Sequence, residues 1–139
     1  MTTGIEAGIL DALLYHLSTY TTTLDIAWPN VDYTPNGENY LEVQVVPNTV
    51  VQVSLGDNGY NRHNGLMQIT VVWKQGEGVI APGEIASAIS AHFKRGTAIN
   101  RNSLVVRTFP PRTASAMPDG AGVRLPVIVP WFCDTPQPA

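Results

Sequence analysis

The chain has 139 residues, of which 44% are hydrophobic and 14% are charged, and its net charge is −3. This length and hydrophobic content predict a single domain over residues 1–139 with a buried core. The acidic balance argues against a nucleic-acid-binding protein, which needs a basic surface to displace counterions from phosphate. We expect a soluble protein without a membrane partner, because no apolar run reaches the roughly 20 residues of a membrane span and no signal-peptide pattern is present.

The numbers of cysteine and turn residues narrow the class of protein further. The one cysteine, Cys133, excludes an intramolecular disulfide and a cysteine-based zinc site, which fits a reducing compartment. The 12 glycines and 11 prolines indicate many turns, and the low charge leaves much weakly polar surface. Such a surface is typical of a protein that works inside an assembly.

Residues 1–20 predict the first helix, because apolar residues recur at helical spacing from Ile5 to Leu17. Thr3 and Glu6 have the spacing of a capping box at its start. Three threonines at positions 21–23 disfavour a helix, so we expect this one to end near Tyr20.

Residues 26–46 connect the first helix to the first predicted strand through two turns that contain proline. Pro29 fixes its own φ and moves Trp28 out of the helical region, and a second turn follows around Pro35. Apolar and polar residues alternate from Tyr40, as in a strand. A corner with these rings and prolines seats either a ligand or a neighbouring subunit.

Two more strands are expected before the second helix. Residues 49–55 alternate and should form a hairpin with the preceding strand through a turn at Pro47-Asn48. The polar residues 56–65 should project as an exposed loop, and they lack the spacing and terminal glutamate of a calcium loop. Residues 66–73 alternate most strongly and should lie in the centre of the sheet.

The second half of the chain predicts one helix and two strands. The helix should carry Pro82 in its first turn, pack Phe93 on the sheet and stop at Gly96. Residues 104–109 predict a strand, and residues 112–122 a long hairpin tip. Residues 123–132 predict an edge or bulged strand, because Pro126 and Pro130 cannot donate hydrogen bonds. Residues 133–139 should form an extended tail.

No group of residues indicates a catalytic, cofactor or metal site. Neither Cys133 nor any serine lies in a nucleophile motif, the glycines around Gly76 lack the spacing of phosphate-binding loops, and no carboxylates form a catalytic pair. His16 and His92 are isolated helical histidines, for which packing is the expected role. We therefore expect a protein that is not an enzyme and has no cofactor.

Six short segments occur in order between residues 26 and 131: Trp28-Pro29-Asn30, Tyr33-Thr34-Pro35, Tyr40-Leu41, residues 65–72, Phe93-Lys94-Arg95-Gly96-Thr97, and Pro126-Val127-Ile128-Val129-Pro130-Trp131. Together they resemble the tail terminator-like proteins of long-tailed, siphovirus-type bacteriophages. The resemblance implies an α+β fold with two helices on one face of a mainly antiparallel, mixed sheet, and long projecting hairpin loops.

The resemblance also implies a structural virion protein that is assembled in the host cytoplasm. It would form a ring, expected to be a hexamer, at the head-proximal end of the tail tube. The ring would stop polymerisation of the tail tube protein and join the tail to the head-completion (connector) proteins of the neck. DNA would pass through its lumen without specific binding, which an acidic protein suits because a basic lumen would hold phosphate.

A closed ring needs two different patches that meet on neighbouring copies, and loops and unpaired strands supply such patches. Ten residues on the predicted loops and edge are therefore candidates for subunit or partner contacts: Tyr33, Thr34, Pro35, Asp57, Asn58, Tyr60, Arg62, His63, Arg112 and Arg124. Six residues are predicted to be structural anchors: Trp28, Pro29, Trp73, Phe93, Gly96 and Trp131.

Two other functions remain open at this point. A head-tail joining protein of the neck would share most of these features. A small ligand-binding or enzymatic α/β domain would instead use Trp28, Tyr33 and Tyr40 as a pocket, and it requires these rings to converge on a concave site.

Overall fold

The computed structural model describes residues 4–20, 24–29, 39–52, 59–74, 78–119 and 122–136. Two helices, α1 (Ile5–Ser18) and α2 (Ile80–His92), accompany a mixed eight-stranded sheet, which confirms the α+β class. The strands are β1 (Asp25–Ala27), β2 (Tyr40–Gln52), β3 (Tyr60–Lys74), β4 (Ala98–Arg101), β5 (Leu104–Thr108), β6 (Arg112–Thr113), β7 (Met117–Asp119) and β8 (Gly122–Pro136).

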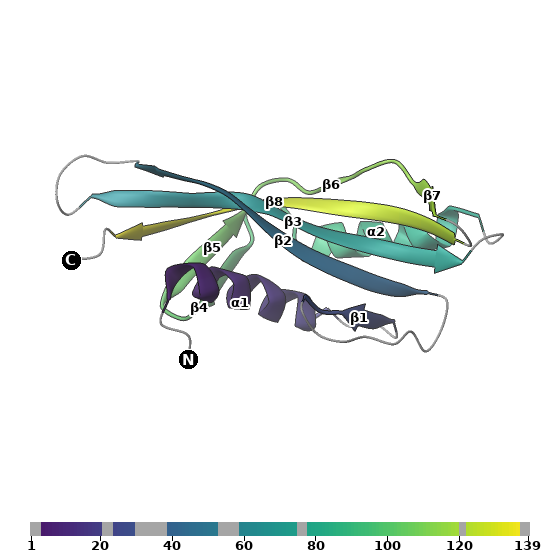
Figure 1. The fold of residues 1–139 in the computed structure, drawn as a ribbon, viewed down its shortest axis with the longest axis horizontal. Helices are drawn as coiled ribbons and strands as arrows, with labels where there is room; N and C mark the ends of the chain where they lie inside the picture. The colour runs from purple at the N-terminus through teal and green to yellow at the C-terminus, as the bar shows by residue number, and fades with distance from the viewer. Residues whose placement is uncertain are drawn as a thin grey trace.

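Three long strands form the backbone of the sheet. The strand order is β1-β2-β3-β8-β5-β4, and β6 and β7 also pair with β8. β1 runs parallel to β2 and all other pairs are antiparallel. β2, β3 and β8 cross the length of the molecule with a strong twist (Figure 1), as strands of L-residues do.

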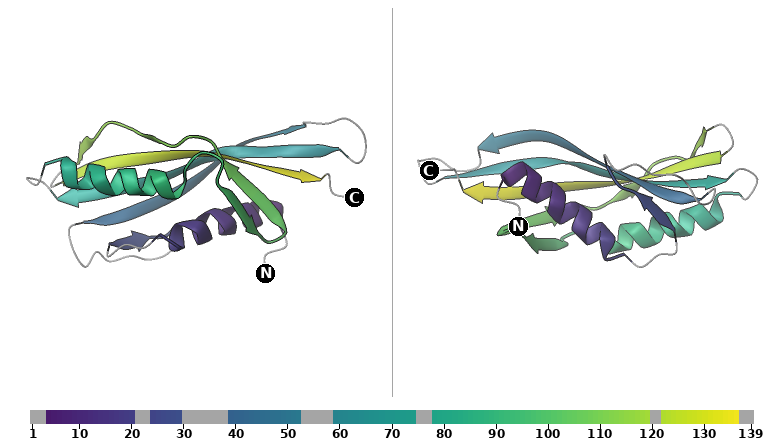
Figure 2. Two further views of the ribbon diagram at one scale, coloured as in Figure 1. Left: turned by 180° about the vertical axis from the view of Figure 1, so that it is seen from behind. Right: turned by 60° about the horizontal axis from the view of Figure 1, so that its bottom comes forward.

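One face of the long strands is buried, because every second residue joins the core. Both helices contribute apolar side chains to the same cluster; α1 contacts β4 and β5, whereas α2 contacts β3, β6 and β8 (Figure 2). Each fully buried aliphatic or aromatic side chain stabilises the fold by about 1.5–3 kcal/mol. The main members are Ile9, Leu13, Leu17, Leu41, Met67, Ile69, Val71, Ile89, Phe93, Val127, Val129 and Trp131.

The hairpin predicted at Pro47-Asn48 is wrong, because β2 continues through these residues. Pro47 pairs with Gly65 and Thr49 with Asn64, so Asn48 is an extra residue in a β-bulge. Proline is tolerated at a bulge on a strand without an outer partner. Among the described residues no strand pairs with residues 43–51 on the side away from β3.

Residues 60–65, predicted as part of an exposed loop at 56–65, belong to a strand, and residues 56–58 lie outside the described residues. β3 begins at Tyr60 and pairs with β2 on one side and with β8 on the other. Polar side chains do not prevent this, because the backbone makes the ladder whatever the side chains are. Residues 66–73 do lie in the middle of the sheet, as predicted.

β8 is a central strand, contrary to the prediction from its prolines. Pro126 and Pro130 turn their carbonyl oxygens away from β3, where these oxygens accept hydrogen bonds from the backbone N–H groups of Ala114 and Phe109. The missing proline N–H groups therefore fall on the side of the short strands β5 and β6, and the ladder to β3 stays complete. β8 also runs to Pro136, so the predicted tail from residue 133 is part of the strand up to there.

The remaining boundaries are close to prediction. Pro82 lies in the first turn of α2, and this helix ends at His92 with Gly96 following at φ +80°.

The predicted tip at 112–122 instead contains β6 and β7. β4 was not predicted; it joins β5 through Asn102 and Ser103, both with positive φ, as in a two-residue hairpin turn. Thr3 of the predicted capping box lies outside the described residues. Among the described residues no helix is long and apolar enough to cross a membrane.

Candidate assembly surface

The sheet has a second face, which we call the outer face. Paired residues of neighbouring strands point to the same side, so the register defines rows across this face. One row consists of Val46, Leu66 and Pro130, followed by Phe109, whose N–H bonds to Pro130. Val46, Leu66 and Phe109 are 43%, 41% and 43% exposed, so an apolar strip crosses the sheet in contact with solvent.

Charged side chains flank this strip on the outer face. Arg62 donates two hydrogen bonds to the Asp134 carboxylate, at 2.8 and 3.0 Å, and its guanidinium lies 4.5 Å from the centre of the Phe132 ring. The hydrogen bond from Arg62 lowers the pKa of Asp134 below its usual value. Both side chains are more than a third exposed, so this pair orders the surface more than it stabilises the fold.

A second ion pair lies at the other end of the outer face. Arg124 of β8 donates a hydrogen bond to Glu42 of β2 across the intervening β3. The row that contains Arg124 also includes Tyr40, Val72 and Met117.

The outer face is basic although the whole chain is acidic. By register, five of the eight Lys and Arg residues point to it: Arg62, Lys74, Arg107, Arg112 and Arg124. By the same register, three acidic residues of the described strands lie at positions on this face: Glu42, Asp119 and Asp134. An exposed apolar strip between basic residues is typical of a surface that binds another protein.

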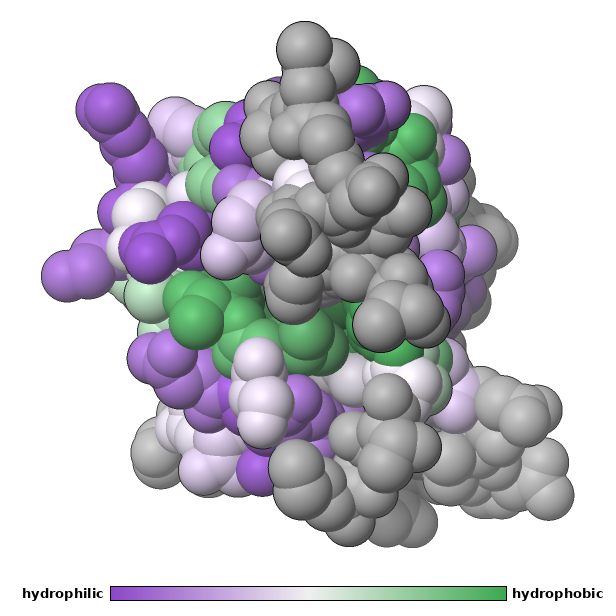
Figure 3. Space-filling model, turned by 90° about the vertical axis from the view of Figure 1, so that its left-hand side faces the viewer, coloured by the Kyte–Doolittle hydropathy of each residue, from purple (hydrophilic) through white to green (hydrophobic). Residues whose placement is uncertain are grey.

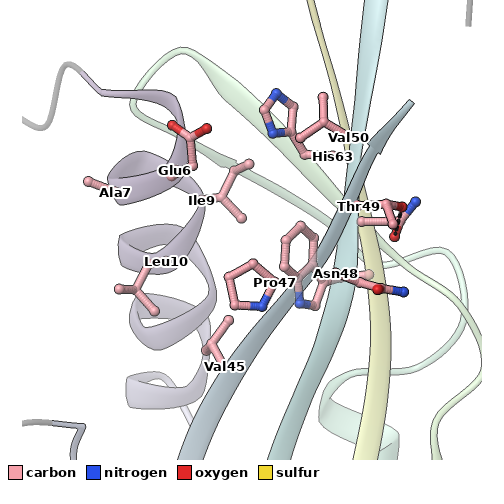
Figure 4. A pocket seen from close by; sticks show the side chains of 12 residues that line it. Glu6, Ala7, Ile9, Leu10, Val45, Pro47, Asn48, Thr49, Val50 and His63 are labelled. Carbon is pink, nitrogen blue, oxygen red and sulfur yellow. Dashed lines mark hydrogen bonds between the residues drawn. The ribbon is translucent and has the colours of Figure 1, made fainter. Parts of the chain in front are cut away.

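A cavity of about 250 Å³ lies on the inner side of the sheet, between α1 and β2. Ile9 and Leu10 line it from the helix, and Val45, Pro47 and Val50 from the strand (Figure 4). Val50 turns inward beyond the bulge, where it pairs with His63, another lining residue.

One wall of this cavity is formed where the Trp131 ring packs over Gly65. The two residues pair across β8 and β3, and a Cβ atom on residue 65 would lie 2.8 Å from Cζ2 of the Trp131 indole. The ring therefore lies over the glycine and contributes to the cavity wall. Its Nε1 is buried and has no hydrogen-bond partner among the described residues.

The structure divides the ten predicted contact residues into three groups. Tyr33, Thr34, Pro35, Asp57 and Asn58 lie outside the described residues. Tyr60, Arg62, Arg112 and Arg124 share the outer face, although they were predicted on two loops and an edge strand. His63 was predicted in an exposed loop but is 8% exposed on the inner face. The apolar strip was missed, because strand register is needed to align its residues.

The six predicted anchors differ in burial. Phe93 and Trp131 are 0% and 2% exposed, whereas Trp28, Pro29 and Trp73 are half-buried. Gly96 is exposed, and its N–H donates to the Thr108 carbonyl at 2.9 Å, which ties the end of α2 to β5.

Of the three aromatic residues predicted for a ligand pocket at the corner, the two that the structure describes, Trp28 and Tyr40, do not converge on one site. Trp28 packs against the core, Tyr40 lies on the outer face and Tyr33 is outside the described residues. Neither Trp28 nor Tyr40 lines the cavity. Among the described residues no group of three His, Cys, Asp or Glu side chains could hold a metal ion.

Comparison with known proteins finds one matching family and solved structures with a similar fold. A family model described as phage tail terminator protein matches residues 8–131. A solved structure that carries only a sequence identifier as its name is 22% identical, with a TM-score of 0.71 over 97% of this chain and 96% of that one. A chain in the virion of a native gene transfer agent particle is 13% identical, with a TM-score of 0.60 over 96% and 100%. At these identities the two structures share the fold. No curated protein matches the sequence.

Proposed function

Because the chain belongs to the phage tail terminator family, a family of structural phage proteins, we propose that six copies form a ring at the head-proximal end of a long tail tube. The ring ends polymerisation of the tail tube protein and connects the tail to the head-completion proteins. The observation that carries this proposal is the family match, which extends over residues 8–131. The fold shared with a chain of a gene transfer agent virion supports a place in a virion.

The outer face supplies a surface for an adjoining ring. Both helices contribute to the core from the buried side of the sheet, so we place them together on the inner face of a single domain. The apolar strip and its flanking arginines are then free to contact the tube protein or the neck. DNA passes through the lumen without specific binding, and the basic outer face therefore turns away from the lumen, because clustered arginines would hold phosphate.

Polymerisation of the cognate tail tube protein tests this function. Purified protein should have about six times the monomer mass by light scattering, and it should shorten the tubes in proportion to its concentration, with a ring at one end in electron micrographs. A protein that stays monomeric at high concentration and leaves tube length unchanged would refute the proposal. Binding to the connector without any effect on tubes would identify a neck protein instead.

A further inference from the structure

The cavity between α1 and β2 lies at an exposed apolar site. Leu10 and Val50, which line it, are 39% and 57% exposed. Seen from the left-hand side of Figure 1, the molecule shows hydrophobic surface between hydrophilic residues (Figure 3). The apolar surface here is therefore open to a partner.

The size of the cavity indicates what it can hold. Small-molecule sites usually enclose about 300–1,000 Å³, whereas an apolar cavity of about 150 Å³ already accepts benzene. At about 250 Å³ the cavity fits one or two aliphatic side chains better than a cofactor. The Trp131 ring lines one wall of the cavity, which suits an apolar occupant.

The opposite end of the molecule carries a matching apolar projection. Ile80 at the first position of α2 is 74% exposed, more than any other large hydrophobic residue of the described chain, and the preceding Val79 is 54% exposed. Their neighbours are small or uncharged: Gly78, Ala81 and Pro82. The first turn of α2 lies at the end far from the first turns of α1 (Figure 1).

We propose that Ile80 and Val79 of a second copy of this chain insert into the cavity between α1 and β2. A projection at one end and a cavity at the other make a heterologous contact, which repeats from copy to copy and closes into a ring when the rotation allows. This inference rests on the proposed ring and identifies the two surfaces that join its subunits.

Cysteine cross-linking tests the contact directly. The double variant Leu10→Cys/Ile80→Cys, oxidised in the assembled state, should give a ladder of covalent multimers on a non-reducing gel. The two positions lie at opposite ends of one copy, so they cannot react within it. The control, Tyr15→Cys/Ile80→Cys, places the first cysteine on an exposed part of α1 outside the cavity and should give no ladder. The native Cys133 is fully buried and does not compete.

A charge substitution measures the contribution of the projection. Ile80→Asp should raise the concentration for half-assembly at least about tenfold, as loss of a central apolar contact does. The variant should stay folded, because Ile80 is exposed and an acidic residue is favourable at a helix N-terminus. Val105→Asp, at a 36% exposed position on β5, is the matched control and should assemble normally.

The outcomes separate this inference from the proposed function. If the wild-type protein forms rings but the double variant gives no ladder and Ile80→Asp assembles normally, the inference is wrong and the ring is made through other surfaces. Cross-linking of Leu10→Cys to the tail tube protein instead of a second copy would also overturn it. A wild-type protein that neither assembles nor caps tubes would refute both.

Discussion

Gly65 fixes the local structure of β3 because three neighbours leave no room for a side chain. A Cβ atom there would lie 2.4 Å from the Val46 carbonyl oxygen and 2.8 Å from the Trp131 ring. Gly65→Ala should therefore destabilise the protein by about 1–3 kcal/mol, the usual cost of overpacking, or by more. Urea unfolding followed by circular dichroism measures this change. Gly83→Ala is the control: nothing lies within 4 Å of its Cβ position in α2, so it should stabilise by about 0.5–1 kcal/mol. Equal effects of the two variants would contradict this account of Gly65.

Cys133 should be inert in the folded protein. Its side chain is 0% exposed, and burial, with a smaller effect of Asp134, raises the pKa of the thiol to about 11. Because the thiolate is the reactive form, an aromatic disulfide reagent at pH 8 should label the native protein only as it unfolds. The labelling rate should rise with urea along the same transition as circular dichroism. Complete labelling within seconds of mixing in buffer would show that β8 opens at its end.

At the scale of elements, two histidines join the C-terminal ends of α1 and α2. His16 Nε2 lies 2.9 Å from the His92 carbonyl oxygen, and His92 Nε2 lies 2.7 Å from the His16 carbonyl oxygen. A carbonyl can only accept, so both Nε2 atoms carry the proton. The rings stack with centroids 4.3 Å apart, and the Phe93 ring meets His16 edge-on. The pair acts as a clamp between the helices.

This clamp predicts a loss of stability in mild acid. Burial lowers the pKa of His16 below its ordinary 6.5. The unfolded chain then takes up a proton near pH 6.5 while the folded chain does not, so the stabilisation is present above pH 6.5 and falls as the pH drops below it. The urea midpoint should decrease between pH 7.5 and 5.5. His16→Gln keeps an N–H donor but does not titrate, so it should show a smaller decrease; an unchanged decrease would mean that other groups cause it.

The elements also show what the sequence could and could not predict. The apolar periodicity of α1 and the alternation at residues 66–73 identified both elements, because burial of one face sets these patterns. Proline misled the prediction twice. At Pro47 a bulge absorbs the residue, and at Pro126 and Pro130 the missing N–H groups lie away from β3. Which side of a strand lacks a donor depends on pairing partners, and a single sequence does not contain these.

At the scale of the molecule, the candidate site depends on strand register in the same way. Tyr60, Arg62, Arg112 and Arg124 were predicted as contact residues on loops and an edge, and the sheet gathers them on one face. The apolar strip between them became visible only when β2, β3 and β8 were aligned. The cavity was not predicted at all, because it forms only where α1 lies beside the second half of β2. In the sequence, Ile9 and Val50 are apolar residues like many others that form the core.

The two surfaces of the molecule predict two separable functions. Leu66 is 41% exposed in the apolar strip of the outer face, and Leu10 is 39% exposed beside the cavity. Lysine is tolerated structurally at both positions, because each side chain can reach solvent. Leu66→Lys should preserve the ring in light scattering but abolish the shortening of tail tubes. A charge in the centre of a protein contact loses its hydration when the partner binds, and this weakens binding. Leu10→Lys should reduce ring formation first, and tube capping only as a consequence. If Leu66→Lys dissociates the ring while Leu10→Lys leaves it intact, the outer face joins the subunits, and the roles assigned to the two surfaces must be exchanged.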